Sequence, residues 1–486
     1  MIIGAGPAGL TAAYELAWRG VPAVILERAA AVGGLAQTVN HKGYLFDIGG
    51  HRFFTKIQVI EDLWKEVLGE DFQPRRRLSR IYYNSRFFRY PLEPANALKG
   101  LGLVESLHCG LSYLRALLWP VRPEDNFEAW VSNRFGRRLF RIFFKTYTEK
   151  VWGIPCQDIE AEWAAQRIKG LSLRSAVWSA LRPRPSGSRS RVIKTLIHEF
   201  HYPRQGPGMM WRQVLTLAEQ KGSRALFERP VEKIFWEPGG VRAVQAGGER
   251  YESDHFISSM PIRDLIRALD PAPPAEVRSA ADDFHYRDFL TVALILKGRD
   301  LFPDTWIYVH DPNVRVGRIQ NYKNWSPDMV PDPETTCLGL EYFCFEGDDL
   351  WSRPDEELID LGLQELIHLK LVRARQFLDG AVVRMPKAYP VYDRTYRRGL
   401  AAVRGFLATV PNLQLVGRNG MHRYNNQDHS MLTGLLAARN ILGEQFDLWA
   451  VNTDGDYHED GPTVSGLDLE SLASTQPRVP RRVGRR

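Results

Sequence analysis

Cysteine is scarce in this sequence. Only four cysteines occur among the 486 residues, and no two of them have the spacing of a C-x-x-C pair. They provide neither a zinc-ligand set nor the dense disulfide framework of a small secreted domain. We therefore expect no metal site and a cytoplasmic protein with reduced thiols. The four are Cys109, Cys156, Cys337 and Cys344.

Long hydrophobic runs are also missing. The most apolar stretch covers residues 101–121, and Glu105, His108 and Arg115 interrupt it. A buried or amphipathic helix fits this pattern better than a transmembrane span, although peripheral contact with a membrane stays open. The first apolar residues lead directly into a glycine-rich loop, so the sequence does not predict a signal peptide.

Charge of one sign does not dominate the chain. Lys and Arg number 64 against 57 Asp and Glu, which gives a net charge of +7 and a pI near 9.1. No basic stripe with interleaved aromatic residues appears, which argues against nucleic acid as a partner. The modest excess fits a basic surface and an arginine-rich tail, or an anionic ligand such as a nucleotide or diphosphate. No paired carboxylates or nucleophile–base motif stands out.

The N-terminal residues predict a dinucleotide site. A short apolar strand leads into Gly4-Ala5-Gly6-Pro7-Ala8-Gly9 and then into a helical pattern. Gly4 permits a tight turn, Gly6 lets the backbone approach a pyrophosphate, and Gly9 lets the helix pack on the strand. The helix N-terminus then offers N–H groups to the phosphates. A second strand ends at Glu27, 18 residues past Gly9. A carboxylate at this position can accept hydrogen bonds from the ribose hydroxyls of an adenosine.

FAD is favoured over NAD by a second glycine-rich stretch. Gly33-Gly34 follow soon after Glu27, and Gly49-Gly50-His51 follow a further apolar segment. We expect these glycines to let the backbone pass close to the flavin's ribityl chain or phosphates. Because only three residues precede the first glycine, we also expect that the natural chain begins earlier.

Alternating helix and strand patterns predict the α/β class. We expect a Rossmann-like FAD-binding domain with an inserted helical region and a mixed-sheet substrate domain. The discontinuous FAD-binding domain comprises residues 1–75, 200–275 and 395–450. The region 76–199 is expected to be mainly helical, 276–394 to contain a sheet, and 456–486 to form a disordered basic tail.

Local patterns predict particular elements within these regions. Residues 57–70 and the stretch from Phe127 onward have helical periodicity. A hairpin with an Asn-Ser turn is expected at 80–91, and a second hairpin with a Pro-Gly-Gly turn at 231–244. Residues 182–191 are rich in Arg, Pro and Ser and indicate an exposed loop or, less often, a ligand-contacting arm.

Five segments resemble the flavoprotein superfamily of amine oxidases and protoporphyrinogen oxidase, and more narrowly the UDP-galactopyranose mutases. Three positions depart from the mutase pattern: Glu93 stands for a glutamine, Thr148 for an asparagine and Trp325 for a tyrosine. These departures indicate another nucleotide or a paralogue with another reaction. The five segments are residues 4–51, 90–93, 147–167, 318–327 and 417–430.

The resemblance implies roles for particular side chains. His51 is expected beside the reactive edge of the flavin, and Arg167, Arg318, Tyr389 and Tyr424 are expected to contact a substrate diphosphate. Guanidinium groups bind phosphate oxygens bidentately and stay charged, which suits this role. Other readings stay open: Arg167 as an exposed helical arginine, Arg318 as the partner of a structural carboxylate, and the two tyrosines as core residues.

The resemblance also implies a set of cofactor-binding residues, with the cofactor carrying the chemistry and the protein orienting and neutralising the substrate. The expected FAD-binding residues are Gly4, Gly6, Pro7, Ala8, Gly9, Glu27, Arg28, Gly34, Leu35, Gly50, His51, Val231, Gly417, Arg418, Asn426, Gln427, Asp428 and Ser430.

The function that the resemblance implies is a mutase-like isomerisation of a nucleotide sugar by reduced FAD, with NADPH or NADH as a candidate reductant. The alternative is a flavin oxidase or dehydrogenase of the amine oxidase or protoporphyrinogen oxidase type. A homo-oligomer stays open.

Overall fold

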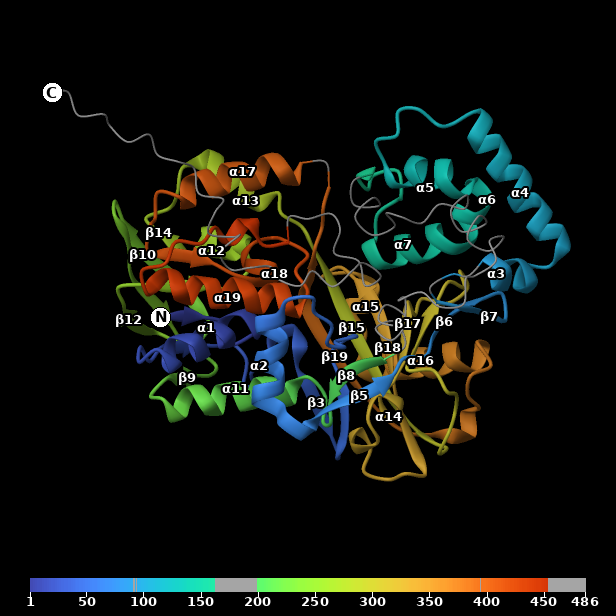
Figure 1. Cartoon of the computed structure of the whole chain (residues 1–486), viewed down its shortest axis with the longest axis horizontal. Helices are drawn as coiled ribbons and strands as arrows, with labels where there is room; N and C mark the ends of the chain where they lie inside the picture. The colour runs from blue at the N-terminus through green and yellow to red at the C-terminus, as the bar shows by residue number, and fades with distance from the viewer. Residues whose placement is uncertain (91, 93, 162–198, 394, 453–486) are drawn as a thin grey trace, which may run out of the picture.

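The structure is a computed structural model, and it describes residues 1–90, 92, 94–161, 199–393 and 395–452 (Figure 1). Four of the sites and regions discussed above lie outside the described residues. They are Glu93, Arg167, the segment 182–191 and the tail 456–486.

A five-stranded parallel sheet forms one half of the molecule (Figure 1). Its strands are only two or three residues long and mostly buried, and neighbouring strands all run in the same direction. The helices α1 (Pro7–Trp18), α11 (Gly208–Gln220) and α19 (Gln427–Ile441) cover it. In sheet order the strands are β20 (Leu413–Leu415), β13 (Phe256–Ser258), β1 (Ile2–Ile3), β2 (Val24–Leu26) and β9 (Arg224–Leu226).

Close helix packing fixes this half of the molecule. A Cβ atom on Gly434 of α19 would lie 2.0 Å from the carbonyl oxygen of Ala8 in α1, so the two helices cross almost backbone to backbone. The helix α2 (Gln58–Leu68) presents Trp64, whose indole N–H donates to Met431 Sδ at 3.1 Å. The helix predicted at 57–70 is thereby confirmed.

A four-stranded sheet lies beside this half, in the order β12-β11-β10-β14. It contains the predicted hairpin, formed by β10 (Val231–Glu237) and β11 (Gly240–Ala246), with β12 (Glu249–Glu252) and β14 (Leu269–Asp270) at its edges. The turn needs glycine because Gly239 and Gly240 have φ values of 109° and 141°.

A seven-stranded mixed sheet forms the second half. Its two longest central strands, β15 (Tyr286–Lys297) and β18 (Thr335–Cys344), are almost entirely buried, which explains their nearly continuous apolar sequence. The helix α16 (Asp355–His368) packs against it. In order, the strands are β19 (Phe377–Pro390), β15, β18, β17 (Arg318–Asn321), β16 (Trp306–Val309), β6 (Ser79–Tyr83) and β7 (Arg86–Arg89).

The β6–β7 hairpin has the predicted Asn-Ser turn. Asn84 and Ser85 have φ values of 49° and 57°, as a two-residue turn with both central residues at positive φ requires. Although the hairpin falls within the range 76–199 that we expected to be mainly helical, it joins the large sheet through parallel pairing of β6 with β16.

Residues 94–152 of that range form a group of helices at one edge of the molecule (Figure 1). It includes the predicted helix that starts at Phe127. No helix among the described residues is both long enough and apolar enough to cross a membrane. The helices are α3 (Pro94–Leu101), α4 (Leu103–Leu118), α5 (Phe127–Phe135), α6 (Arg137–Leu139), the π-helix η3 (Phe140–Lys145) and α7 (Thr146–Trp152).

Candidate flavin and substrate site

The glycine loop joins β1 to α1 and is built as the sequence predicts. Gly4 has φ +98°, and its N–H donates to the carbonyl of Leu26 at 2.8 Å. A Cβ atom on Gly9 would lie 2.0 Å from the carbonyl oxygen of Gly4, so only glycine fits there. Helix α1 starts at Pro7 without a side-chain cap, which leaves its first N–H groups facing out of the loop.

Glu27 is held rigidly at the end of β2. Its carboxylate accepts hydrogen bonds from the backbone N–H groups of Ala5 at 2.7 Å and Ala29 at 2.9 Å, and the side chain is buried. It therefore lies directly behind the glycine loop, where an adenosine ribose is expected. Arg28 next to it is exposed.

The second glycine pair packs against the first loop. The N–H of Gly33 donates to the carbonyl of Ala5 at 2.8 Å, and a Cβ atom on Gly34 would lie 3.2 Å from Gly6 Cα. Two glycine backbones therefore meet at the entrance of α1. Leu35 follows in a short 3₁₀ turn and packs beside Ile48.

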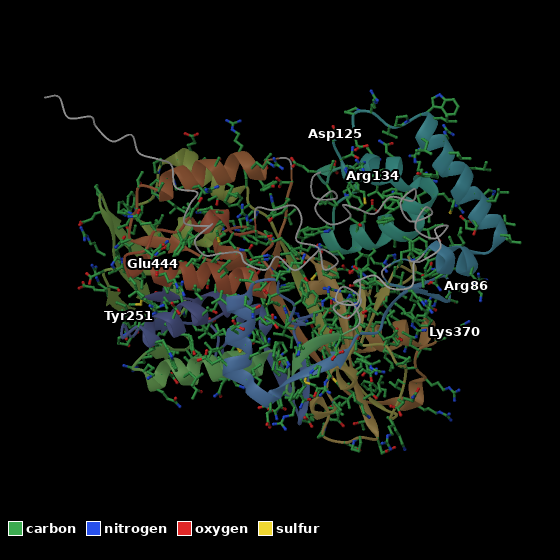
Figure 2. All side chains as sticks on the ribbon, in the orientation of Figure 1. Arg86, Asp125, Arg134, Tyr251, Lys370 and Glu444 are labelled. Carbon is green, nitrogen blue, oxygen red and sulfur yellow. The ribbon has the colours of Figure 1, made fainter. Side chains whose placement is uncertain are left out.

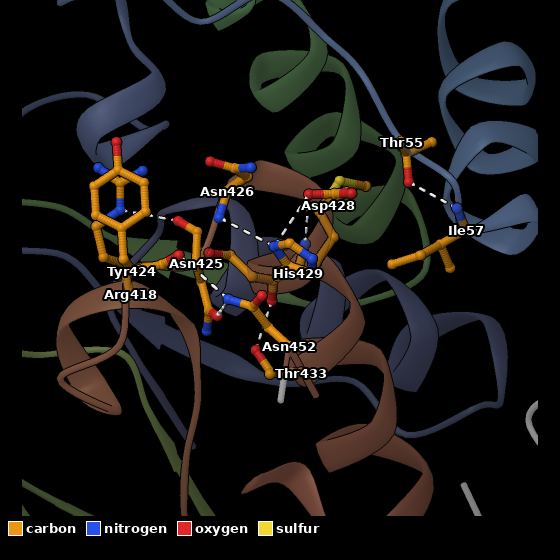
Figure 3. Close-up of polar contacts among 12 residues, drawn as sticks. Thr55, Ile57, Arg418, Tyr424, Asn425, Asn426, Asp428, His429, Thr433 and Asn452 are labelled. Atoms are coloured by element: carbon orange, nitrogen blue, oxygen red, sulfur yellow. Dashed lines mark hydrogen bonds and ion pairs between the residues drawn. The ribbon is translucent and has the colours of Figure 1, made fainter. Parts of the chain in front are cut away.

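The 417–430 turn closes the loop from the other side (Figure 3). Gly417 has φ +78°, and a Cβ atom there would lie 3.1 Å from Ala8 Cβ. Arg418 Nε donates to the carbonyl of Asn425 at 2.9 Å, which braces the turn. Asn426 caps the N-terminus of α19, where Asp428 and Ser430 are buried.

His51 lies between the two halves of the molecule. Its Nε2 is 2.6 Å from the carbonyl oxygen of Ile48, and since a carbonyl only accepts, Nε2 carries the proton. Desolvation, followed by the positive charges of Arg418 and Arg318, lowers the pKa of His51 to about 4. The imidazole is therefore neutral at pH 7. Gln427 at the start of α19 donates to the His51 carbonyl at 3.5 Å.

A buried ion pair stands on the large sheet beside His51. Arg318 of β17 pairs with Glu341 of β18, which is completely buried and also accepts from Gln320 Nε2 at 2.6 Å. Burial alone would lower the pKa of Arg318, but the Glu341 carboxylate raises it well above its ordinary value. Arg318 also donates to Tyr389 Oη at 3.2 Å.

Two tyrosines form an aromatic wall next to this ion pair. The rings of Tyr389 and Tyr424 stack with centroids 5.6 Å apart and an interplanar angle of 13°. Trp152 of α7 lies 6.3 Å from Tyr389 and 6.1 Å from Tyr424, and the Arg418 guanidinium lies 4.9 Å from the Tyr424 ring (Figure 3). Burial raises the pKa of Tyr389, so its hydroxyl stays protonated and can donate.

The structure adds residues that the sequence analysis did not select. Glu341 and Gln320 are polar residues within buried strands, and such a lone acid in an apolar run was the signal that could have found Glu341. Arg52 lies 4.7 Å from the Trp306 ring, and Arg77 lies 5.8 Å from it. Desolvation and then the neighbouring Arg77 lower the pKa of Arg52 to about 10.

The helix α7 is anchored to the large sheet by a lysine. Lys150 Nζ donates to the carbonyls of Asp311 at 2.6 Å, Val316 at 3.2 Å and Val309 at 3.4 Å. Burial lowers the pKa of Lys150 to about 8. This anchor holds Trp152, two residues further on, against the tyrosine wall.

Among the expected substrate-contacting residues, Arg318, Tyr389 and Tyr424 come together beside His51 and Arg418. Arg318 has the carboxylate partner that was one of the open readings, namely Glu341. Trp325 is a core residue stacked on Tyr202, away from solvent.

The described residues contain no group of three or more His, Cys, Asp or Glu side chains placed to hold a metal ion.

Val231 begins β10 and packs against the core of the parallel sheet. Two residues earlier, the N–H of Arg229 donates to the carbonyl of Glu27 at 2.9 Å, so the start of the hairpin adjoins the nucleotide loop. The four cysteines are all buried and free.

A parallel sheet with a glycine loop at a helix N-terminus, joined to a large mixed sheet, defines the class of FAD-binding flavoproteins. The model of the family of flavin-containing amine oxidoreductases matches residues 7–442, and the chain belongs to this family. The protein is therefore a flavin-dependent enzyme of the amine oxidase superfamily, and the family implies FAD as its cofactor.

Solved structures share the whole architecture. A reduced UDP-galactopyranose mutase superposes with a TM-score of 0.80 at 23% identity, covering 93% of this chain and 97% of that one. A putative protoporphyrinogen oxidase from Exiguobacterium sp. 255-15 gives a TM-score of 0.70 at 19% identity, covering 91% and 98%. The predicted α/β fold is confirmed by these two matches.

Curated relatives match shorter segments. An L-amino-acid oxidase of Sistrurus catenatus edwardsii is 30% identical over 132 residues, 24% of this chain and 26% of the relative. A phytoene desaturase of Phycomyces blakesleeanus is 22% identical over 286 residues, 55% and 48% of the two chains. The chain thus spans only about a quarter to a half of the length of these relatives.

The described residues fit a flavin. The close contacts of Gly6, Gly9 and Gly417, with backbone atoms and with the small side chain of Ala8, let backbone approach backbone at the entrance of α1. Further along the same surface, the carbonyl oxygen of the buried Gln427 amide has no hydrogen-bond partner in the described part of the chain, and it is available to a bound group with donors. Bound flavin would supply redox chemistry there, and the loop, Glu27 and the 417–430 turn would hold it.

Proposed function

We propose that this protein is a mutase-like flavoenzyme that isomerises a nucleotide-linked sugar, with the flavin in its reduced form. One observation carries the proposal. Two guanidinium groups, Arg318 and Arg418, converge with Tyr389 and Tyr424, and within the described part of the chain Glu341 is the only carboxylate that pairs with either arginine. The site therefore carries a net positive charge in a low-dielectric setting, which favours an anionic substrate such as a diphosphate.

The side chains have distinct tasks in this proposal. Arg318 offers a planar set of donors to phosphate oxygens, and Glu341 fixes the orientation of that guanidinium. The Tyr389 and Tyr424 hydroxyls add neutral hydrogen bonds. His51 is neutral, so the positive charge that binds the anion comes from the arginines. The aromatic wall with Trp152 excludes water from the reacting sugar.

Anaerobic turnover tests the proposal. The purified protein is reduced with dithionite and mixed with UDP-galactofuranose, and the nucleotide sugars are separated by chromatography. Formation of UDP-galactopyranose without net reoxidation of the flavin is the expected result. Absence of turnover by a fully flavin-loaded sample would contradict it.

A pair of arginine variants connects turnover to the site. Arg318→Lys keeps the charge but removes the bidentate fork, and it should raise KM strongly. Arg315→Ala is the matched control, since Arg315 lies three residues earlier, is exposed and pairs with Asp349 at 2.7 Å. Its kinetics should equal those of the wild type.

An oxidase or dehydrogenase of the amine oxidase or protoporphyrinogen oxidase type is the second candidate. The stacked Tyr389–Tyr424 pair with Trp152 beside it also suits an apolar or flat substrate, and the L-amino-acid oxidase match points the same way. Either type predicts anaerobic bleaching of the oxidised flavin by an amine, L-amino acid or porphyrinogen, because the substrate's two electrons reduce the flavin. An oxidase predicts hydrogen peroxide in addition when air is present. The mutase proposal predicts neither.

A further inference from the structure

The helix α4 exposes an unusual row of apolar side chains. Leu103 is 92% exposed, Leu118 67% and Trp119, directly after the helix, 72%. The exposed leucines and valine recur at helical spacing, so they share one face of the helix. The face comprises Leu103, Val104, Leu107, Leu111, Leu114, Leu117 and Leu118. Of the two readings of residues 101–121, the amphipathic helix is the one observed.

This helix buries little of itself against the rest of the protein. Cys109 is its one buried residue and packs in an apolar cluster with Phe88 and Ile142. Beside it, in partly exposed positions, Glu105 pairs with Arg138, and Ser112 Oγ accepts from the Arg138 N–H at 3.0 Å. Ser106 Oγ donates to the carbonyl of Leu98 at 3.1 Å. Since leucine in water loses the benefit of burial, a helix that turns its leucines outward is built for an apolar environment.

The surroundings of the helix are basic. Residues 86–141 contain nine Lys and Arg against five Asp and Glu. Lys99 near the end of α3, Arg115 in α4 and Arg122 in the loop after α4 are exposed and form no ion pair with the described residues. Glu124 and Glu128 are both paired with arginines of the same region. Figure 2 labels Arg86, Asp125 and Arg134 among the side chains of this region.

We propose that α4 docks this protein onto the surface of an anionic lipid bilayer, with the helix lying in the plane of the interface. The 16-residue helix is too short to span a bilayer, but an in-plane helix buries only its apolar face. Trp119 at its end has the amphipathic ring that favours the headgroup level. The helix lies at the outer edge of the molecule, where a flat surface can reach it (Figure 1).

Charge complementarity selects this occupant over a second copy of the chain. Two copies that met through α4 would bring two basic rims together, and like charges across an interface oppose association. Anionic headgroups would instead attract Lys99, Arg115 and Arg122 while the leucines enter the acyl region. The docking is independent of which reaction the site performs.

Vesicle flotation with the full chain tests the docking. The protein is mixed with vesicles of phosphatidylcholine alone or with phosphatidylglycerol added, and the floating fraction is measured. We expect binding to the phosphatidylglycerol vesicles that weakens as salt is raised, with amide exchange slowed in residues 103–119. No binding to either vesicle overturns the proposal.

Two triple variants locate the contact. Leu107→Glu/Leu111→Glu/Leu118→Glu should reduce vesicle binding at least about tenfold. The control places the same charges on exposed apolar residues elsewhere, at Val21, Leu378 and Leu442. If the control loses binding equally, net charge and not α4 is responsible, and the proposal fails.

A third variant tests the basic rim. One basic residue near an anionic surface contributes about fivefold to the affinity. The variant Lys99→Glu/Arg115→Glu/Arg122→Glu should therefore lower the affinity for phosphatidylglycerol vesicles by clearly more than that factor. Analytical ultracentrifugation provides the competing outcome. A dimer that the leucine variant dissociates, combined with no vesicle binding, would assign the face to a second copy and overturn the proposal.

Discussion

Glu341→Gln is the most informative single substitution in the proposed substrate site. Glu341 is completely buried, pairs with Arg318 and accepts a hydrogen bond from Gln320. A glutamine at this position can still accept from Gln320 through its carbonyl oxygen. What the substitution removes is the negative charge that compensates Arg318, and Tyr389 Oη is then the main remaining acceptor for that guanidinium.

The magnitude follows from two opposing effects. Breaking a buried ion pair by neutralising one partner costs roughly 3–5 kcal/mol of unfolding free energy. We expect the low end, about 3 kcal/mol, because the Gln320 hydrogen bond is retained. An anionic ligand then meets an uncompensated guanidinium, and one charge-assisted hydrogen bond contributes about 1.5–3 kcal/mol. UDP should therefore bind the variant about tenfold more tightly, or about 1.4 kcal/mol.

Urea unfolding of the flavin-loaded protein, with and without UDP, measures both effects. The variant should be less stable without UDP and should gain more stability than the wild type at the same UDP concentration. Glu365→Gln is the matched control, since Glu365 is also buried but accepts from Tyr342 Oη at 2.9 Å and Val316 N at 3.0 Å instead of pairing with Arg318. It should lose stability without any change in the UDP effect.

A double variant completes the design. Arg318→Met/Glu341→Gln removes both charges, so it should recover part of the lost stability and lose the enhanced response to UDP. The reasoning is refuted if Glu341→Gln responds to UDP as the wild type does while the Glu365→Gln control behaves as expected.

Three further predictions concern the scaffold. Gly9→Ala should sharply lower the ratio of bound flavin to protein, read from absorbance, because its Cβ meets a backbone oxygen at 2.0 Å; Gly405→Ala, in a helix with open space, should not. Burial lowers the pKa of His422 from 6.5 to about 4. As the pH falls below 6.5, the unfolded chain therefore takes up a proton that the folded protein does not, and the folded protein loses stability. In urea titrations, the unfolding free energy of His422→Phe should fall by about 3 kcal/mol less than that of the wild type between pH 7 and pH 4. Lys150→Met should lower the melting temperature, since it leaves three backbone carbonyls without their donor; an unchanged melting temperature would contradict the proposed anchor.

Local chemistry made part of the fold predictable. The glycine loop before α1 and the Asn-Ser turn of the β6–β7 hairpin each depend on backbone angles that few residues adopt. Such constraints act within a few residues, so the sequence alone predicts the elements on either side. The predicted helix at 57–70 and the hairpin at 231–244 follow in the same way from periodicity and turn residues.

The partners of charged groups were not predictable in this way. Arg318 and Glu341 are 23 positions apart, and they meet because β17 and β18 pair in a register that places them opposite each other. The β6–β7 hairpin joined the large sheet for a similar reason, since the edge of β16 offered it a pairing partner. Sheet register depends on the packing of both faces, which no short window of sequence contains.

The sequence by itself determined the nucleotide loop, the short strands around it and the helical periodicity of residues 103–118, because these depend on local backbone and side-chain properties. Only the tertiary structure decided that His51, Arg318, Tyr389 and Tyr424 share one site, and that the leucines of α4 face outward. A periodic pattern establishes that a helix has an apolar face. Which side of the molecule that face meets is set by the neighbours, here by the packing of Cys109 in an apolar cluster and by the Glu105–Arg138 ion pair beside it.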